Sequence, residues 1–268
     1  MLKKRPFLDS TGSSISRSGT GTRNETNVYE KAEISLAGET VSYDATVFPY
    51  VIRKREIELI KKVLQAKRPE KILDYGCGGG WLSLLLSRWG FDVVGVDASK
   101  NMLRRAKLAC HEAGFIICDA MRLPLRDETF DCIIGISILH HLDLKKALKE
   151  LMRVSLARSG FLFMEPNLLN PLSAIGRKLL PTELHTKEEK PFTPGYLKTA
   201  LELADFSLER YFALFFLSFP VARLFKMTHV TLGLSSVRII SSLESALERL
   251  PGIGHLNSTI IAVGKTNR

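Results

Sequence analysis

Hydrophobic and polar positions along the chain follow two periods, one typical of helices and one typical of buried strands. Residues 51–67 place apolar side chains at helical spacing between Lys and Arg, and Pro69 follows as a stop, so we expect an amphipathic helix there. Residues 71–74 form a short apolar run, and a glycine-rich turn separates this run from leucines that recur at helical spacing from Leu82. The pattern therefore predicts helix, strand, tight turn and helix in succession.

The alternation of strands and helices continues beyond that turn. Apolar runs predict further strands at 91–97, 115–118, 130–137 and 161–165. Helical spacing predicts a helix that Ser99 caps and another from Leu144 to Val154. Strands that alternate with helices pair in parallel, and near-continuous apolar strands indicate a sheet covered on both faces. The sequence therefore predicts an α/β fold with a doubly wound sheet.

The rest of the chain departs from this rhythm. Residues 166–192 are rich in Pro, Asn and charge, and a predicted helix at 194–204 follows them. An apolar segment at 208–219, an amphipathic helix ending near Leu250 and a last strand at 258–263 come next. Long connections at the carboxyl end of a parallel sheet are where sites are usually built, so we expect the 166–192 loop on the substrate side.

The stretch 211–225 is apolar enough to raise the question of a membrane span. It contains Pro220 and Arg223 and is shorter than the roughly 20 residues that cross a bilayer. Two interpretations stay open. The stretch is either a buried strand followed by a helix packed on the domain, or an apolar cap that holds an apolar substrate or rests on a membrane surface.

Length and composition predict one domain. The chain has 268 residues, enough for one good-sized α/β domain. Residues 1–25 are rich in Ser, Thr, Gly and basic residues and lack a signal-peptide core, so we expect a disordered basic tail there. A single domain at 26–268 follows, with an apolar insertion at about 211–250.

Charge and cysteine content indicate which partners and which cellular compartment to expect. The formal net charge of +10 permits contact with nucleic acid or anionic membranes, but much of it alternates with Glu, as on a solvated surface. The 4 cysteines lack metal-ligand spacing, so we expect no metal site and reduced thiols in a cytoplasmic protein.

The glycine-rich turn carries the candidate chemistry. From Asp74 to Trp81 the chain is D-Y-G-C-G-G-G-W. In the dinucleotide fingerprint G-x-G-x-x-G, the third glycine lets helix and strand pack closely beside a pyrophosphate. That position is Trp81 here, and its indole argues against a dinucleotide.

The order of motifs instead resembles the class I S-adenosylmethionine-dependent methyltransferases, and most closely their methyltransferase type 11 group. An acidic residue precedes G-x-G-x-G, and Asp97 ends the second strand. D-A at 119–120 follows the third strand, S-I-L-H-H-L at 137–142 the fourth, and E-P-N at 165–167 the fifth. The resemblance, which covers about residues 45–165, implies a Rossmann-like fold with a seven-stranded, mostly parallel sheet and an antiparallel last strand.

The resemblance also implies S-adenosylmethionine as the cofactor. The residues it assigns to cofactor binding are Asp74, Gly76, Cys77, Gly78, Gly80, Asp97, Ala98, Met102, Asp119, Ala120 and Ser137. Asp74 is suited to the cofactor's ammonium group, and Asp97 to both ribose hydroxyls. Met102 can pack on the adenine face. Asp119 and the Ala120 N–H are suited to hydrogen bonds with the adenine edge.

Methyl transfer from a sulfonium is an in-line displacement, so the protein mainly aligns the nucleophile and excludes water. A base is needed only where the nucleophile must lose a proton. His140 and His141 are candidate bases, and a packing or loop-fixing role is the alternative for this pair. Glu165 and His185 are further candidates for contact with the substrate.

The sequence predicts a methyltransferase that acts on oxygen or carbon of a small, apolar or lipid-like acceptor. The aromatic segment that begins at Tyr211 supports an apolar acceptor. Methyltransferases of nucleic-acid amino groups typically carry (N/D)-P-P-(Y/F/W) after the fourth strand, whereas this chain has S-I-L-H from Ser137. An RNA or protein methyltransferase and a non-catalytic S-adenosylmethionine-binding protein remain alternatives, and peripheral membrane contact and oligomeric state stay open.

Overall fold

The structure is a computed structural model that describes residues 47–179, 191–218, 221, 234–250 and 252–268. Several predictions fall wholly or partly outside these residues. They concern the basic tail at 1–25, His185, and parts of the 166–192 loop and the 211–250 insertion.

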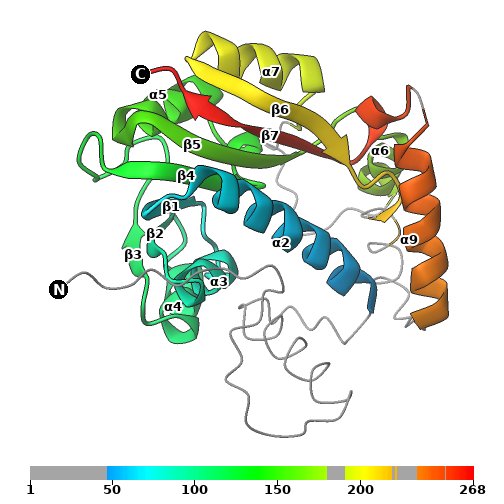
Figure 1. The fold of residues 1–268 in the computed structure, drawn as a ribbon, viewed down its shortest axis with the longest axis horizontal. Helices are drawn as coiled ribbons and strands as arrows, with labels where there is room; N and C mark the ends of the chain where they lie inside the picture. Colours follow the sequence, from blue (N-terminus) through cyan, green and yellow to red (C-terminus); the bar gives the residue numbers. More distant parts are fainter. Residues whose placement is uncertain (1–46, 180–190, 219–220, 222–233, 251) are drawn as a thin grey trace, which may run out of the picture.

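A seven-stranded sheet runs through the molecule in the order β3-β2-β1-β4-β5-β7-β6 (Figure 1). Its strands are β1 (Lys71–Tyr75), β2 (Asp92–Asp97), β3 (Gly114–Ile117), β4 (Phe130–Ile136), β5 (Ser155–Pro166), β6 (Phe206–Leu214) and β7 (Thr259–Thr266). Neighbouring strands pair in parallel except where β7 pairs antiparallel with β5 and β6. The predicted fold class, including the antiparallel last strand, is confirmed. The chain reverses its direction of travel across the sheet at β1, where open α/β sheets bind ligands.

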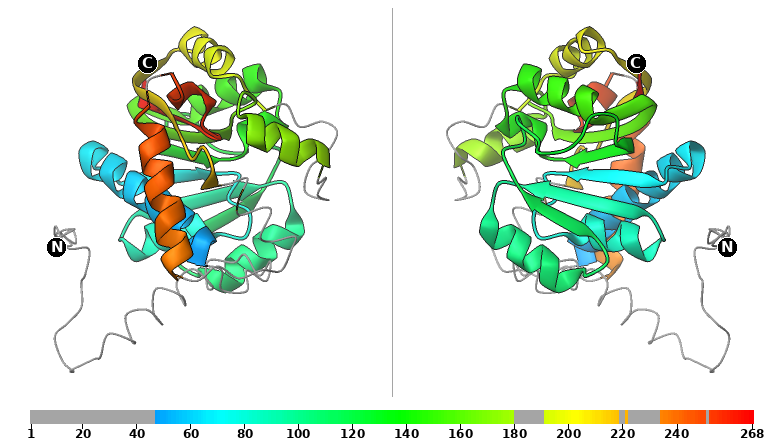
Figure 2. Two further views of the ribbon diagram at one scale, coloured as in Figure 1. Left: turned by 90° about the vertical axis from the view of Figure 1, so that its right-hand side faces the viewer. Right: turned by 90° about the vertical axis from the view of Figure 1, so that its left-hand side faces the viewer.

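Helices cover both faces of the sheet (Figure 2). They are α2 (Val47–Lys67), α3 (Trp81–Arg88), α4 (Lys100–Ala109), α5 (Leu144–Val154), α6 (Pro171–Leu179), α7 (Pro194–Leu203) and α9 (Leu234–Glu248). Two 3-10 turns, η1 (Leu139–His141) and η2 (Gly254–Leu256), precede α5 and β7. Ser99 caps α4 as predicted, because its hydroxyl accepts a hydrogen bond from the Met102 N–H at 3.3 Å.

Two hydrophobic cores hold these layers together. Ile60 of α2 belongs to the core that includes Ile72 of β1. Leu148 of α5 belongs to the other core, which includes Leu73, the next residue of β1. Successive residues of one strand thus enter different cores, which explains why the strands are apolar at nearly every position.

The structure differs from the predicted elements after β4. β5 begins at Ser155, six residues before the predicted start at 161, because Ser155 pairs with Phe130 and a register shift precedes the pairing of Gly160 with Cys132. Residues 156–158 of this irregular stretch are exposed, so they lack a strand-like apolar pattern. Helix α6 was not predicted; the Asn170 side chain accepts a hydrogen bond from Ser173 N–H at its start, at 2.6 Å.

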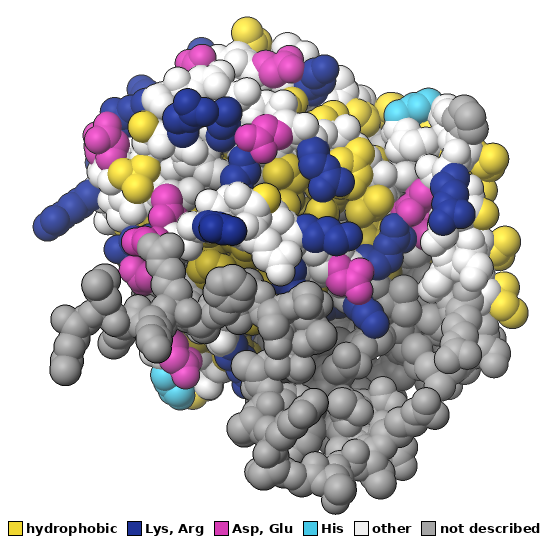
Figure 3. Space-filling view, in the orientation of Figure 1, with side chains coloured by type: hydrophobic (Ala, Val, Ile, Leu, Met, Phe, Trp, Pro, Cys, Tyr) yellow, Lys and Arg dark blue, Asp and Glu magenta, His cyan; other side chains and the backbone are white. Residues whose placement is uncertain are grey.

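The apolar segment contains β6, an edge strand whose residues are mostly half-buried. This confirms the strand in the first interpretation of the segment, and the helix expected after it falls largely outside the described residues. In the part of the chain that the structure describes, no helix is long and apolar enough to cross a membrane. Basic and acidic side chains are interspersed over the face shown in Figure 3, which agrees with a solvated surface there.

Candidate functional site

The glycine-rich turn is fixed to the carboxyl end of β2. The backbone N–H groups of Gly76 and Cys77 both donate to the carbonyl of Val96, each at 2.9 Å. Gly76, Gly78 and Gly80 have φ angles of +73°, +51° and +83°, in the left-handed region that glycine adopts without steric cost. The turn therefore needs glycine at these positions for its backbone path alone.

The three glycines differ in what surrounds them. A Cβ on Gly76 would lie 2.6 Å from the Ile138 side chain, and one on Gly80 would lie 2.7 Å from Ala106. A Cβ on Gly78 would meet nothing within 4 Å. Gly76 and Gly80 thus make room for the protein's own packing, whereas Gly78 borders open space, as expected where a ligand approaches the backbone.

Asp97 lies beside this open space, at the end of β2. Its Oδ2 accepts a hydrogen bond from Gly78 N–H at 2.9 Å, and its Oδ1 accepts one from Ser99 N–H at 2.8 Å. A carboxylate has about four acceptor sites, so each oxygen can accept one further hydrogen bond. This geometry suits a vicinal diol, such as that of a ribose, because both hydroxyls can donate to one fixed carboxylate.

Asp74 lies beneath the turn and is buried. Its Oδ2 accepts a hydrogen bond from the Ser83 hydroxyl of α3 at 2.6 Å. Burial raises the pKa of Asp74 from 3.8 to about 7, despite the opposing effect of the Ser83 hydrogen bonds. A neighbouring cation, such as an ammonium group, would favour the charged carboxylate.

The loop after β3 forms the next part of this edge. Asp119 is exposed, and its Oδ1 accepts a hydrogen bond from Met121 N–H at 2.8 Å. Ala120 accepts a hydrogen bond from the buried Tyr75 hydroxyl at 2.7 Å through its carbonyl. Two apolar side chains are exposed nearby: Met102 at 37% and Ile117, which pairs with Asp97, at 54%.

Ile117 was not among the predicted residues. Its only signal in the sequence is its position two residues before the predicted Asp119. Ile117 lies in an apolar strand, and that pattern alone favours a buried residue. Cys77, which was predicted, is buried, and burial raises the pKa of its thiol. Its backbone N–H and carbonyl are both hydrogen-bonded within the protein, to Val96 and to Gly80. Ala98 and Ser137 are exposed at the same edge of the sheet, after β2 and β4.

Glu165, at the end of β5, organises the loop that follows β4. Its carboxylate is fully buried and accepts hydrogen bonds from the N–H groups of Ile138, Leu139 and His140, at 3.0, 2.8 and 3.3 Å. Ser137, just before them, has a φ of +54°, an uncommon conformation for a residue with a side chain. The Glu165 carboxylate therefore stabilises a loop that the backbone alone would not favour.

The same carboxylate orients the His140 ring. His140 Nδ1 lies 2.8 Å from Glu165 Oε2, and the ring is 6% exposed. Because the carboxylate accepts hydrogen bonds, Nδ1 is assigned as the donor, which leaves Nε2 as the basic nitrogen of the neutral ring. The His141 ring is exposed and lies against that of His140, with 3.9 Å between ring centroids.

A second buried glutamate organises the far side of this edge. Glu244 of α9 accepts hydrogen bonds from the N–H groups of Phe216, Leu217 and Ser218 and from the Ser218 hydroxyl. Asn167, just after β5, joins this side to the rest: its amide group donates to the carbonyls of His255 and Asn257, at 2.8 and 2.7 Å. The long connections are thus tied to the sheet by side chains distant in sequence.

Comparison with known proteins identifies the fold and its chemistry. Residues 73–164 match the family model described as a methyltransferase domain. The demethylmenaquinone methyltransferase of Thermus thermophilus is 31% identical over 190 residues, which cover 68% of this chain and 80% of that protein. The demethylmenaquinone methyltransferase of Thermotoga maritima is 37% identical over 111 residues, 40% of this chain and 46% of that protein. A human protein named as a probable tRNA methyltransferase 9B is 33% identical over 133 residues, 47% of this chain and 28% of that protein.

Two of these three curated relatives, those of Thermotoga maritima and human, are matched over less than half of their own length. Solved structures share the fold. A methyltransferase from Archaeoglobus fulgidus, described as SAM-dependent, superposes with a TM-score of 0.52 at 22% identity, covering 78% of this chain and 94% of that chain. A protein from Pyrococcus horikoshii superposes with a TM-score of 0.54 at 22% identity, covering 92% of this chain and 100% of that chain. The family model, the Thermus thermophilus relative and the fold agree, and the chain belongs to the class I S-adenosylmethionine-dependent methyltransferases, in the type 11 group.

Proposed function

We propose that this protein transfers a methyl group from S-adenosylmethionine to an oxygen or carbon atom of a small apolar or lipid-like acceptor. The observation that carries the donor half of the proposal is the open space beside Gly78, next to the Asp97 carboxylate. A turn that packs tightly at Gly76 and Gly80 but not at Gly78 has room for a ligand at one point, and the nearest fixed acceptor suits a ribose.

The residues at this edge fit the cofactor in chemical type. The bound sulfonium supplies an activated methyl group and its own leaving group. Asp97 would accept hydrogen bonds from the ribose hydroxyls, and Asp74 would pair with the ammonium group. Met102 and Ile117 would offer apolar contact to the adenine, and Asp119 and the Ala120 N–H would bind its edge. The remaining predicted residues, which lie in the turn and after β2 and β4, would border the cofactor: Gly76, Cys77, Gly80, Ala98 and Ser137.

The residue that we propose takes a proton from the acceptor is His140. Its Nδ1 is held by Glu165, so its Nε2 is unprotonated when the ring is neutral. A base oriented by a carboxylate is a recurrent arrangement in proton transfer. Glu165 itself accepts hydrogen bonds from four donors and serves as a positioning residue. The adjacent His141 supports the ring of His140 through their contact.

Two observations support an apolar acceptor. Leu168 and Leu169, which directly follow β5 at the carboxyl edge of the sheet, are 46% and 41% exposed. One exposed leucine is ordinary, but two in succession beside a ligand site offer an apolar contact surface. The two bacterial relatives are named for a quinone acceptor, demethylmenaquinone.

The experiment that tests the proposal uses cofactor labelled in its methyl group. The protein is offered quinone and lipid extracts in one set of reactions, and total RNA and protein in another. We expect label in the quinone or lipid fraction. Label confined to RNA or protein would contradict the apolar acceptor, and cofactor binding without label transfer to any fraction would favour a non-catalytic binding protein.

A pair of variants serves as the internal control. Asp97→Asn removes the charge at the ligand end of β2 and is expected to abolish most of the transfer. Asp92→Asn makes the same change at the other end of the strand, where Asp92 pairs weakly with Lys71 at 3.5 Å. This second variant is expected to transfer label as the wild type does.

A further inference from the structure

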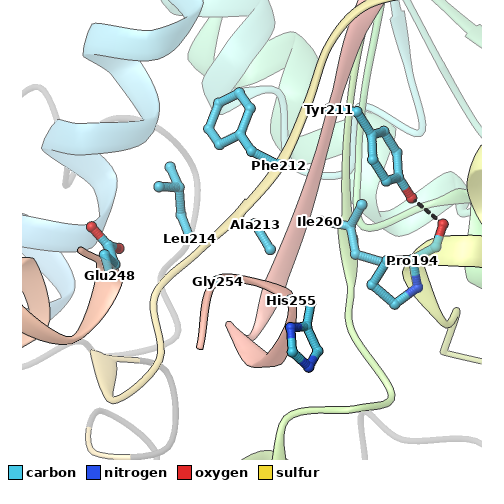
Figure 4. Close-up of a pocket in the computed structure, with 9 residues that line it drawn as sticks. All are labelled: Pro194, Tyr211, Phe212, Ala213, Leu214, Glu248, Gly254, His255 and Ile260. Atoms are coloured by element: carbon cyan, nitrogen blue, oxygen red, sulfur yellow. Dashed lines mark hydrogen bonds between the residues drawn. The ribbon is translucent and has the colours of Figure 1, made fainter. Parts of the chain in front are cut away.

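A cavity of about 560 Å³ lies at the end of the edge strand β6. Nine of the residues that the structure describes line it, and Figure 4 shows them: Pro194, Tyr211, Phe212, Ala213, Leu214, Glu248, Gly254, His255 and Ile260. Phe212 and Leu214 lie on one side of β6, and Tyr211 lies on the other side. The lining comes from both faces of the strand, so the cavity follows the end of β6 rather than a single face of the sheet.

The cavity shares the carboxyl edge of the sheet with the glycine-rich turn. β5 and β6 both pair antiparallel with β7, so they run in the same direction. The lining residues of β6 are its last four, 211–214, and Ile260 lies near the start of β7. β6 is three strand positions from β4, which places the cavity roughly 14 Å along the edge from the β4 loop. The exposed Leu168 and Leu169 follow β5, which lies between these strands.

The polar groups of the lining are largely engaged within the protein. Glu248 accepts hydrogen bonds from Phe215 N–H at 3.0 Å through Oε1 and from the Arg55 guanidinium at 2.6 Å through Oε2. The Tyr211 hydroxyl donates to the Pro194 carbonyl at 2.5 Å. The His255 ring makes no hydrogen bond to the described residues and is exposed, so one polar contact is available to a ligand.

We infer that this cavity binds the apolar chain of the methyl acceptor. Small-molecule sites typically have volumes of about 300–1,000 Å³, with mostly apolar walls and few polar groups. The cavity meets both conditions, and its engaged polar groups offer little to a charged or strongly polar ligand. The acceptor is accordingly an elongated molecule whose reactive end lies near His140 and whose apolar chain passes Leu168 and Leu169. The link to the acceptor depends on the proposed function, whereas the binding of an apolar chain does not.

Two glycines allow a matched test. Gly254 lines the cavity, and a Cβ there would meet nothing within 4 Å, at an ordinary φ. Gly195 of α7 is equally free of close atoms, is exposed, and does not line the cavity. Gly254→Trp therefore adds a large side chain at the cavity wall without backbone strain, and Gly195→Trp adds the same side chain outside the lining.

The first measurement is calorimetric titration with n-decanol in the absence of cofactor. We expect n-decanol to bind the wild type and Gly195→Trp, and to lose at least tenfold in affinity for Gly254→Trp. Equal affinity for all three proteins, or no binding to the wild type, would overturn the site. Thermal unfolding of both variants near the wild-type temperature shows that the comparison is between folded proteins.

The second measurement connects the cavity to methyl transfer. With labelled S-adenosylmethionine and the lipid and quinone extracts, Gly254→Trp is expected to lose transfer while it binds the cofactor like the wild type. Unchanged transfer by Gly254→Trp would overturn the cavity's role in acceptor binding. If the wild type transfers label to neither extract, the proposed apolar acceptor fails, and the n-decanol titration still decides whether the cavity binds an apolar chain.

Discussion

Two buried glutamates, Glu165 and Glu244, fix their neighbouring loops in the same way. Each carboxylate accepts hydrogen bonds from three successive backbone N–H groups, at 138–140 and at 216–218. Such donors compensate a buried carboxylate for the loss of water. The fourth partner differs: Glu165 holds the His140 ring, whereas Glu244 holds the Ser218 hydroxyl.

That difference distinguishes the loop at 138–140, which belongs to the candidate site, from the connection at 216–218, which has a structural role. Glu165 lies at the carboxyl edge beside the glycine-rich turn, and its fourth partner is the imidazole that we propose as a base. The fourth partner of Glu244 is a hydroxyl in a long connection. The same local physics therefore orients the proposed base in one half of the molecule and fixes a long connection in the other.

The largest expected effect comes from removing the charge of each glutamate. Glu165→Gln should lower methyl transfer by about 100-fold or more, because His140 loses its orientation and general base catalysis typically contributes that much. The loss should fall on kcat rather than on KM. Glu244→Gln should keep both constants close to those of the wild type. Equal losses of kcat in the two variants would mean that both glutamates are only structural.

Substitutions of the glycines in the turn test whether the cofactor binds beside Gly78. Gly78→Ala keeps the fold at a cost of about 1–2 kcal/mol for its left-handed backbone, but its methyl group enters the space assigned to the cofactor. We expect at least a tenfold loss of affinity for S-adenosylmethionine by calorimetry, roughly 1.4 kcal/mol. Gly80→Ala adds a collision with Ala106 and should destabilise the fold more, as denaturant unfolding will show. Wild-type affinity in Gly78→Ala would place the cofactor elsewhere.

A change at Glu244 should lower the free energy of unfolding rather than the rate of methyl transfer. Glu244→Gln leaves at least one buried N–H without an acceptor, which costs about 1–3 kcal/mol in the free energy of unfolding. Glu202→Gln makes the same change at an exposed position of α7, where the carboxylate lies 3.9 Å from Lys198 Nζ, and should alter that free energy little. Urea titrations of both variants make the comparison. If the two variants unfold at the same urea concentration, the hydrogen bonds of Glu244 do not stabilise the connection.

Asp74 provides a third buried carboxyl, one that has Ser83 rather than three N–H groups as its partner. Its pKa rises from 3.8 to about 7 in the folded state, so its contribution to stability is full below pH 3.8 and is lost as pH rises through 7. The wild type should therefore lose stability relative to Asp74→Asn between about pH 4 and 7, by at most about 1.4 kcal/mol per pH unit. Affinity for S-adenosylmethionine should change in the opposite direction and rise with pH. Parallel stability curves for the two proteins would show that the Asp74 pKa is not raised.

The first half of the molecule was largely predictable because its signals are local. Helix α5 has the predicted bounds, Ser99 caps α4, and the motif residues from Asp74 to Ser137 gather at one edge of the sheet. The second half depends on contacts between distant residues. Glu244 meets partners 26 to 28 positions away, and Asn167 meets carbonyls 88 and 90 positions away. No periodicity marks such residues, so neither was predicted as an organiser of the fold.

The glycines show a second limit of sequence reasoning. The pattern G-x-G-x-G treats Gly76, Gly78 and Gly80 alike, and all three were expected to admit the cofactor. The structure distinguishes them by the atoms around each, since Ile138 and Ala106 occupy the space beside two of them. Those neighbours come from other elements, and only the folded arrangement brings them to the turn.

The most direct test of the account is calorimetric titration of the wild type, Asp97→Ala and Asp92→Ala with S-adenosylmethionine and, separately, with NAD. The account predicts that the wild type and Asp92→Ala bind S-adenosylmethionine with equal affinity, that Asp97→Ala binds it at least tenfold more weakly, and that none of them binds NAD. Binding of NAD, or S-adenosylmethionine affinity unaffected by Asp97→Ala, would contradict it.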